Sequence, residues 1–185
     1  MSDGAAVVVR AWDDDDARAT LEVFRRAVHG TARHDYTPEQ LAAWAPGDMP
    51  LADWAGRRRE AATVVAELAG RVVGFGDLDP AGHVGMLYVD PSAARTGVAS
   101  ALLEHLVAQA HRRGLAELST HASITALPFF ERHGFVVVEE RRPVRRGVAM
   151  TNFAMRRQLA APGDGARIDT ADAPERTSGG QGIAR

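Results

Sequence analysis

Short apolar runs recur along the chain and alternate with stretches in which apolar residues lie three or four positions apart. The short runs are bounded by glycine, proline or aspartate, which is typical of strands. The periodic stretches are typical of helices that bury one face. Strands are predicted at residues 7–10, 63–68, 71–78, 86–89, 116–120, 135–140 and 148–155.

Two helical stretches precede the second predicted strand. The first begins at the aspartates of residues 13–16, whose charge suits the positive end of a helix. A polar link at residues 29–36 separates it from the next helix, where Thr37 to Gln40 have the form of a capping box. That helix breaks at residues 45–47 and resumes as far as the arginines at 57–59.

Residues 63–68 and 71–78 flank Ala69-Gly70 and predict a hairpin. A turn at residues 79–82 leads into the next strand, which gives three antiparallel strands in succession. The run at 116–120 follows a long helix and predicts a parallel strand. The order of elements therefore predicts an α/β fold with a mixed, mostly antiparallel sheet of six or seven strands.

Composition favours one soluble domain. The chain has 185 residues and is 45% hydrophobic, enough for one substantial core. Residues 1–159 are predicted to form that single domain. Residues 160–185 contain few large apolar groups, so we expect a disordered tail.

Several classes of function are disfavoured by the residues present. The net charge of -2 gives no general attraction to nucleic acid or to a membrane surface. No targeting segment or membrane span is visible, which predicts a cytoplasmic protein. There is no cysteine, and no His/Asp/Glu spacing signals a metal site. The aspartates at 13–16 cannot converge on one ion, because neighbours on a helix point apart.

The stretch from residue 86 to residue 103 predicts a strand, a tight turn and a long helix. Val98, Leu102, Leu106 and Ala110 recur at the helical period. The start of a helix presents unpaired N–H groups that bind phosphate, and Gly97 lets a bulky anion approach the backbone. The ligand predicted from these residues is a phosphorylated cofactor.

This loop resembles the pyrophosphate loop of the GCN5-related N-acetyltransferases, the GNAT family. The family pattern, Gln/Arg-x-x-Gly-x-Gly/Ala, falls on residues 94–99, with Ala94 in place of the first Gln or Arg. Residues 122–135 resemble the family's later segment, which ends in an aromatic pair and Gly-Phe. Residues 36–44 and 151–155 are most similar to the small bacterial YafP-like branch.

The resemblance implies a sheet with helices on both faces, splayed between its fourth and fifth strands, and acetyl-CoA bound in that cleft without a metal. It implies that the backbone of Leu87 and Val89 binds the pantetheine, with Ser123 and Phe130 beside it. The pyrophosphate would lie on residues of the loop and first helical turn: Arg95, Thr96, Gly97, Val98, Ala99 and Ser100.

Direct attack of an amine on the thioester needs a base for the amine and a proton for the departing thiolate. The family's usual acid, a tyrosine, falls on Phe130, which has no proton to give. We expect Tyr88 to take this role, with Tyr36 or water as alternatives. Asp77 and His121 are candidate bases.

The acceptor is left open between a small amine, an amino-compound antibiotic or toxin, and a peptide N-terminus. The resemblance places His29, His34, Tyr36 and Trp44 on the acceptor side. Because the usual tyrosine is missing, a non-catalytic acyl-CoA sensor is the alternative function. A homodimer formed through the last strands is plausible.

Overall fold

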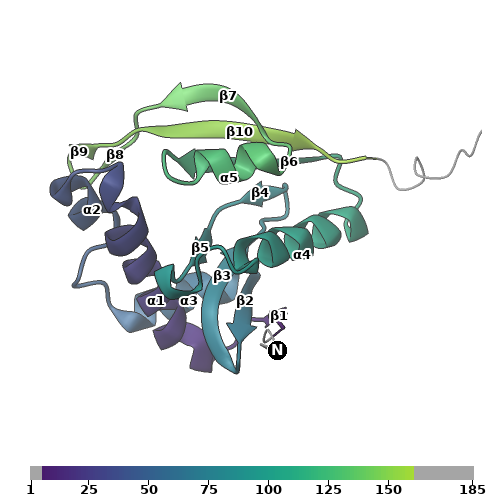
Figure 1. The fold of residues 1–185 in the computed structure, drawn as a ribbon, viewed down its shortest axis with the longest axis horizontal. Coiled ribbons are helices and arrows are strands. Elements are labelled where there is room, and N and C mark those ends of the chain that lie inside the picture. The colour runs from purple at the N-terminus through teal and green to yellow at the C-terminus, as the bar shows by residue number, and fades with distance from the viewer. Residues whose placement is uncertain (1–5, 161–185) are drawn as a thin grey trace, which may run out of the picture.

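The computed structural model describes residues 6–160 of the 185-residue chain (Figure 1). Apart from Ala160, the tail that the sequence predicts to be disordered lies outside these residues. None of the helices in the described range has the length and apolar character needed to span a bilayer.

The predicted helices are present, and the first is longer than expected. Residues 29–34, expected to belong to a polar link, continue α1 as a π-turn and a 3₁₀ turn. This continuation buries Val28 and Ala32 on the same side. The helical elements are η1 (Asp14–Asp16), α1 (Ala17–Arg26), η2 (Ala27–Thr31), η3 (Ala32–His34), α2 (Pro38–Trp44), α3 (Leu51–Glu60), η4 (Pro91–Ala93), α4 (Val98–Arg112) and α5 (Leu127–Arg132).

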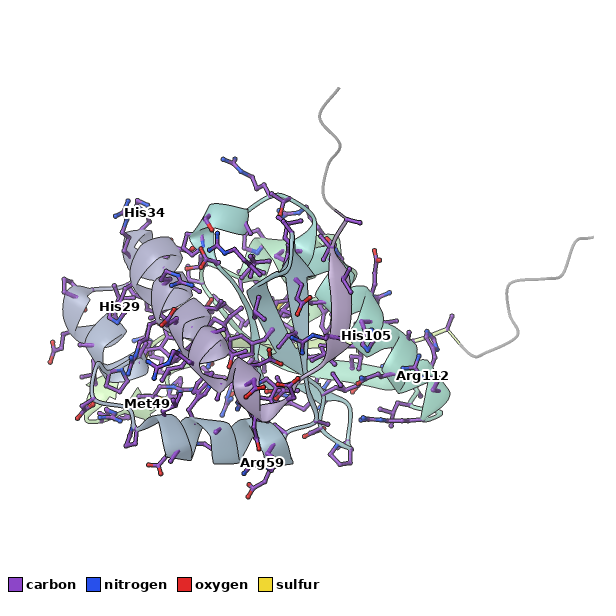
Figure 2. The ribbon with its side chains drawn as sticks, turned by 90° about the horizontal axis from the view of Figure 1, so that it is seen from below. His29, His34, Met49, Arg59, His105 and Arg112 are labelled. Carbon is purple, nitrogen blue, oxygen red and sulfur yellow. The ribbon has the colours of Figure 1, made fainter. Side chains whose placement is uncertain are left out.

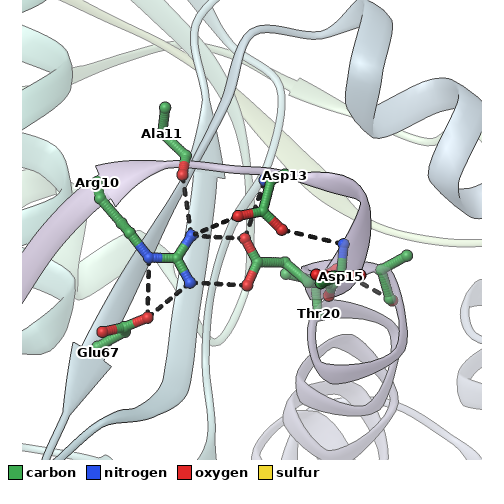
Figure 3. Close-up of polar contacts among 8 residues, drawn as sticks. Arg10, Ala11, Asp13, Asp15, Thr20 and Glu67 are labelled. Carbon is green, nitrogen blue, oxygen red and sulfur yellow. Dashed lines mark hydrogen bonds and ion pairs between the residues drawn. The ribbon is translucent and has the colours of Figure 1, made fainter.

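The aspartate run begins the first helix and binds a protein cation. Asp13 and Asp16 form a reciprocal capping box. Asp16 also receives two hydrogen bonds from Arg10, at 2.7 and 2.8 Å, and the same guanidinium binds Glu67 on the neighbouring strand (Figure 3). Burial alone would raise the pKa of Asp16, but these hydrogen bonds outweigh it and hold the pKa below its usual value.

The strands of residues 6–160 form two four-stranded sheets and a short ribbon. The first sheet has the order β1-β2-β3-β5, the second has the order β4-β6-β10-β7, and β8 pairs with β9. The strands are β1 (Val8–Ala11), β2 (Thr63–Leu68), β3 (Arg71–Asp77), β4 (His83–Val84), β5 (Leu87–Val89), β6 (Glu117–Ser123), β7 (Val136–Arg141), β8 (Val144–Arg145), β9 (Val148–Ala149) and β10 (Asn152–Gln158).

The two sheets are joined by the segment from His83 to Val89. Its first part, β4, runs parallel to β6, whereas its second part, β5, is antiparallel to β3. The chain changes partner at Gly85 and Met86, and β5 and β6 diverge from there. The expected mixed, mostly antiparallel sheet that splays between these strands is therefore confirmed.

A buried ion pair holds this change of partner in place. One Asp77 oxygen lies 2.5 Å from Arg58 of α3, and the other accepts the Met86 amide at 2.9 Å. A Cβ at Gly85 would lie 2.8 Å from Asp77, so only glycine fits there without a shift. Asp77 thus fixes the bend at Gly85 and Met86, which is the hinge between the two sheets.

The helices cover the two sheets unequally. Helices α1, α2 and α3 gather on the left of Figure 1 and pack on the first sheet around Val65 and Phe75. The other core lies under α4 and α5 and includes Leu118 and Met155 of the second sheet. The opposite face of the second sheet contributes no residue of β6 or β10 to either core.

The last predicted strand, residues 148–155, is divided in two. Residues 148–149 belong to the ribbon β8-β9, which turns at Arg146 and Gly147 with positive φ at both. The chain then passes Met150, which is buried, and starts β10 at Asn152. The ribbon and the sheet are therefore separate elements at this point.

We expect Asp77→Asn to lower the free energy of unfolding by about 3–5 kcal/mol, because it leaves the buried Arg58 without a counter-charge. Urea denaturation at neutral pH measures the difference. Asp14→Asn is the matched control, since Asp14 pairs with Arg59 while both side chains stay more than half exposed. Equal losses for the two variants would contradict the role given to Asp77.

Candidate functional site

A cavity of about 550 Å³ opens where the two sheets diverge. Its walls come from the π-turn after α1, from β5, from the loop that leads into α4, and from α5. The charged residues in its lining are arginines, joined by one histidine, and the lining contains no aspartate or glutamate. An elongated, anionic ligand suits such a cleft.

The loop before α4 is fixed by Asp90. This carboxylate accepts hydrogen bonds from the amide and hydroxyl of Ser92 and pairs with Arg26 of α1 at 2.6 Å. Burial would raise the pKa of Asp90, but these contacts hold it below its usual value. The loop then passes Arg95 and Gly97, which have φ of 61° and 88°.

Gly97 sits at the N-cap of α4 and faces open space, with no atom within 4 Å of a Cβ built on it. The first intrahelical bond runs from the Ala101 amide to the Gly97 carbonyl, so the preceding amides are left for a ligand. Arg95 and Arg132 add positive charge to the cavity. This helix start can therefore hold a phosphate or pyrophosphate.

The free edge of β5 forms another wall. The amides of Asp77 and Asp90 donate to the carbonyls of Met86 and Val73, which marks the hydrogen-bonded pairs of β3 and β5. By alternation, the backbone groups of Tyr88 bind β3, and those of Leu87 and Val89 face the cleft. An extended ligand chain can hydrogen-bond to this edge as a further strand does.

The cavity brings together nine of the ten residues that the sequence predicts for the cofactor. Thr96 is not among its lining residues, because its hydroxyl turns back to the Ala93 carbonyl at 2.7 Å. Those that line it are Leu87, Val89, Arg95, Gly97, Val98, Ala99, Ser100, Ser123 and Phe130.

A smaller cavity of about 60 Å³ adjoins the first one. The two share six lining residues, which therefore stand between them: Trp44, Leu87, Tyr88, Ser123, Ala126 and Phe130. Met86, Thr120 and His121 are found in the lining of the smaller cavity. A second reactant could approach the same point of β5 from this side.

Tyr88 lies between the two cavities with a hydroxyl that can donate a proton. Trp44 donates a hydrogen bond to that oxygen at 3.1 Å, and the phenolic hydrogen has no acceptor among residues 6–160. Burial raises the pKa of Tyr88 to about 12. The group stays protonated at neutral pH, as an acid must before it acts.

His121 lines the smaller cavity, with its ring 4.8 Å from that of His83. Partial burial lowers the pKa of His121, and the charges of Arg141 and His83 lower it further, whereas Glu139 opposes them. The imidazole is therefore neutral at pH 7 and can accept a proton.

Asp77, the other candidate base, lines neither of these cavities. Both of its oxygens are engaged by Arg58 and by the hinge backbone. Burial raises its pKa, and the Arg58 charge counteracts part of that rise. Its position makes it a structural carboxylate, so the expectation that it lies in the opening of the cleft is corrected.

Of the four residues expected on the acceptor side, Trp44 alone lines the cavities. His29 binds the Ala45 carbonyl, and His34 lies exposed at the outer end of the helical segment that follows α1 (Figure 2). Tyr36 is buried, donates to the Thr151 carbonyl and accepts from the Ile124 amide. None of these three residues belongs to the lining of either cavity.

Some lining residues were missed by the sequence reasoning. Thr31 and Ala32 reach the cavity because the π-turn extends α1 toward the loop. His133 binds Ser100 at 3.1 Å and packs against Phe129 of α5, so it closes the side of the larger cavity between α4 and α5. The signal for His133 was its place in residues 122–135, which resemble the family, whereas Thr31 and Ala32 lie in the polar link at residues 29–36 and had none. Within residues 6–160, no group of three or more potential metal ligands is found.

Comparison with known proteins agrees with this geometry. The family model described as an acetyltransferase (GNAT) domain matches residues 32–157. An uncharacterized N-acetyltransferase of Escherichia coli strain K12, YafP, is 39% identical over 151 residues, which cover 81% of this chain and 95% of YafP.

Two solved structures are similar in fold. A GCN5-related N-acetyltransferase from Rhodopseudomonas palustris has a TM-score of 0.81 and 30% identity, covering 86% of this chain and 99% of its own. The PaiA N-acetyltransferase from Thermoplasma acidophilum, solved with coenzyme A, has a TM-score of 0.70 and 16% identity, covering 83% and 99%. The domain match, the identity to YafP and the splayed sheet agree, and the chain belongs to the GNAT family of N-acetyltransferases.

Proposed function

We propose that the protein transfers the acetyl group of acetyl-CoA directly to a primary amine of a small molecule. The observation that carries this proposal is the pair of adjoining cavities, which meet at Leu87 and Tyr88. The larger has the volume and the positive charge that suit the cofactor, and the smaller can admit the amino group of an acceptor to the same point of β5.

In this proposal the pyrophosphate lies on the first turn of α4 and the pantetheine runs along the free edge of β5. The Leu87 amide faces the cleft and would stabilise negative charge on the thioester oxygen. Phe130, which is buried, packs against the cofactor and donates no proton. The coenzyme A in the similar PaiA structure supports the choice of cofactor.

The proton transfers are assigned to two residues between the cavities. Neutral His121 accepts a proton from the acceptor ammonium, directly or through water, before the amine attacks the carbonyl carbon. The attacking nitrogen then loses its second proton to water as the C–S bond breaks, and Tyr88 gives its proton to the CoA thiolate. Tyr88 regains a proton from solvent after the products leave.

The alternative, a sensor that binds acyl-CoA without turnover, is separated by one experiment. Acetyl-CoA and CoA are titrated into the protein by calorimetry, and the same samples are then assayed for thiol release with a panel of amines. Binding with amine-dependent release supports the transferase. Binding without release with any amine supports the sensor, and absence of binding contradicts both.

The first prediction concerns Gly97. We expect Gly97→Asp to weaken CoA binding at least tenfold more than Gly97→Asn, because only the carboxylate repels the pyrophosphate. Both side chains tolerate positive φ, have free space and suit an N-cap, so helix loss does not explain a difference. Calorimetric Kd values of CoA provide the measurement, and equal values would contradict the phosphate site.

The second prediction concerns Tyr88. We expect Tyr88→Phe to lower kcat by about 10–100-fold, toward the small end for general acids because CoA thiolate is a good leaving group. The Kd of acetyl-CoA should stay unchanged, since the aromatic ring is retained and only its hydroxyl is removed. Steady-state thiol release across pH is measured, and full kcat at every pH would exclude Tyr88 as the acid.

The third prediction is a pH profile. The pKa of His121 lies below the ordinary imidazole value of about 6.5, so its acid limb should begin below that pH. We expect kcat/KM to fall there, because the protonated imidazole cannot accept a proton. His121→Gln should be slower and should lack this acid limb. His105 of α4, labelled in Figure 2, is the control, and His105→Gln should keep the acid limb. Burial and the charge of Arg112 lower its pKa too, but it lines neither cavity. An acid limb that survives in His121→Gln would contradict the assignment.

A further inference from the structure

The face of the second sheet that no helix covers begins at the smaller cavity. Strand pairing aligns side chains across it in rows, because directly opposite residues point to the same face. One row contains His121, Ala154 and Glu139, from β6, β10 and β7. The row beside it contains Ser123, Asn152 and Arg141. His121 and Ser123 belong to the cavity, so the rows lead outward from it.

Two polar groups in the row of Ser123, Asn152 and Arg141 have no partner among residues 6–160. The Arg141 guanidinium makes no hydrogen bond or ion pair with any other residue between 6 and 160, although Glu139 and Glu140 are close in sequence. The Asn152 Oδ1 atom is buried and also lacks a partner within that range. Arg141 is only partly exposed, so its charge is not fully solvated. A partly buried cation without an acidic partner is expected to bind an anion, and the Asn152 Oδ1, which can only accept a hydrogen bond, lies where it can orient the guanidinium.

The charges around the smaller cavity are mainly positive. No aspartate or glutamate lines it. Arg141 and His83 act on His121 through their charges, and Arg145 and Arg58 act on Tyr88. The opposing acidic groups are Glu139 at His121 and Asp77 at Tyr88, and Asp77 is itself paired with Arg58. A polycationic acceptor would meet repulsion here, whereas an anionic group would be attracted.

We infer that the acceptor is a small amine that carries a carboxylate, and that Arg141 binds this carboxylate beside Asn152. This inference rests on the proposed function, because it names the acceptor of the same site.

The geometry suits a small aminocarboxylate. Two strand spacings separate β6 from β7, about 10 Å, and an arginine side chain covers most of that distance. The small Ala154 leaves room for the guanidinium to reach back toward His121. The forked guanidinium matches a carboxylate with two parallel hydrogen bonds. The same positive charges favour the neutral form of the amine, which is the form that attacks.

The test compares amines that differ only in the carboxylate. Phenylalanine, β-alanine and 4-aminobutyrate are assayed against phenethylamine, ethylamine and propylamine by thiol release from acetyl-CoA. Binding of the N-acetylated forms of the same compounds to the CoA-bound protein is measured by calorimetry, which needs no turnover. We expect the carboxylate-bearing member of at least one pair to be favoured tenfold or more.

Arg141→Gln should remove that preference by lowering kcat/KM for the carboxylate alone. Asn152→Asp should weaken it as well, because the new charge occupies Arg141. Arg156→Gln is the matched control, since Arg156 lies on the same face of β10 two rows from Asn152 and is not next to the cavity. It should leave the preference unchanged.

The outcomes separate the inference from the proposed function. Carboxylate-selective binding without thiol release would support the inference and overturn catalysis. Turnover or binding that is equal for both members of every pair, or better without the carboxylate, would overturn the inference and leave the transferase standing. A preference that survives Arg141→Gln and Asn152→Asp would overturn the assignment to Arg141.

Discussion

The cleft depends on a single constraint, the transfer of one extended segment between two sheets. Val84 still pairs with β6, and Leu87 already pairs with β3, so the chain has two residues in which to change partner. Their backbone groups would be unsatisfied at this bend without Asp77, which accepts the Met86 amide. Its charge is balanced by Arg58, which stacks on Trp54 and so ties the hinge to α3. The bend at which the cleft opens is therefore held by Asp77 and Arg58, which line neither of its cavities.

Most residues that line the larger cavity could be predicted from the sequence because their signals are local. A strand, a glycine turn and a helix follow one another between residues 86 and 103, and the physics of a helix start assigns the phosphate. Likewise Phe130 and Ser123 lie in one segment whose spacing resembles the family. Thr96 is absent from the lining, and its hydroxyl binds the Ala93 carbonyl of its own loop, a contact that spacing does not reveal.

The acceptor side was harder to predict because its contacts join distant parts of the chain. Tyr36 binds backbone groups 88 and 115 positions away, and these contacts bury a residue that its sequence position made a binding candidate. Asp77 had the chemistry of a base, but its partner Arg58 lies 19 positions away on α3, and no local pattern links the two residues. A pattern of residue types identifies a carboxylate, and only tertiary structure shows whether it is free to accept a proton.

The uncovered face of the second sheet also separates two demands on the protein. Its side chains on β6 and β10 lie outside both cores, so changing them alters little of the packing that stabilises the fold. The hinge, in contrast, tolerates few residue types, because a Cβ at Gly85 would lie 2.8 Å from Asp77. In a protein built in this way, surface substitutions on this face can change the acceptor that is bound. The cofactor site and the free energy of unfolding would be little affected.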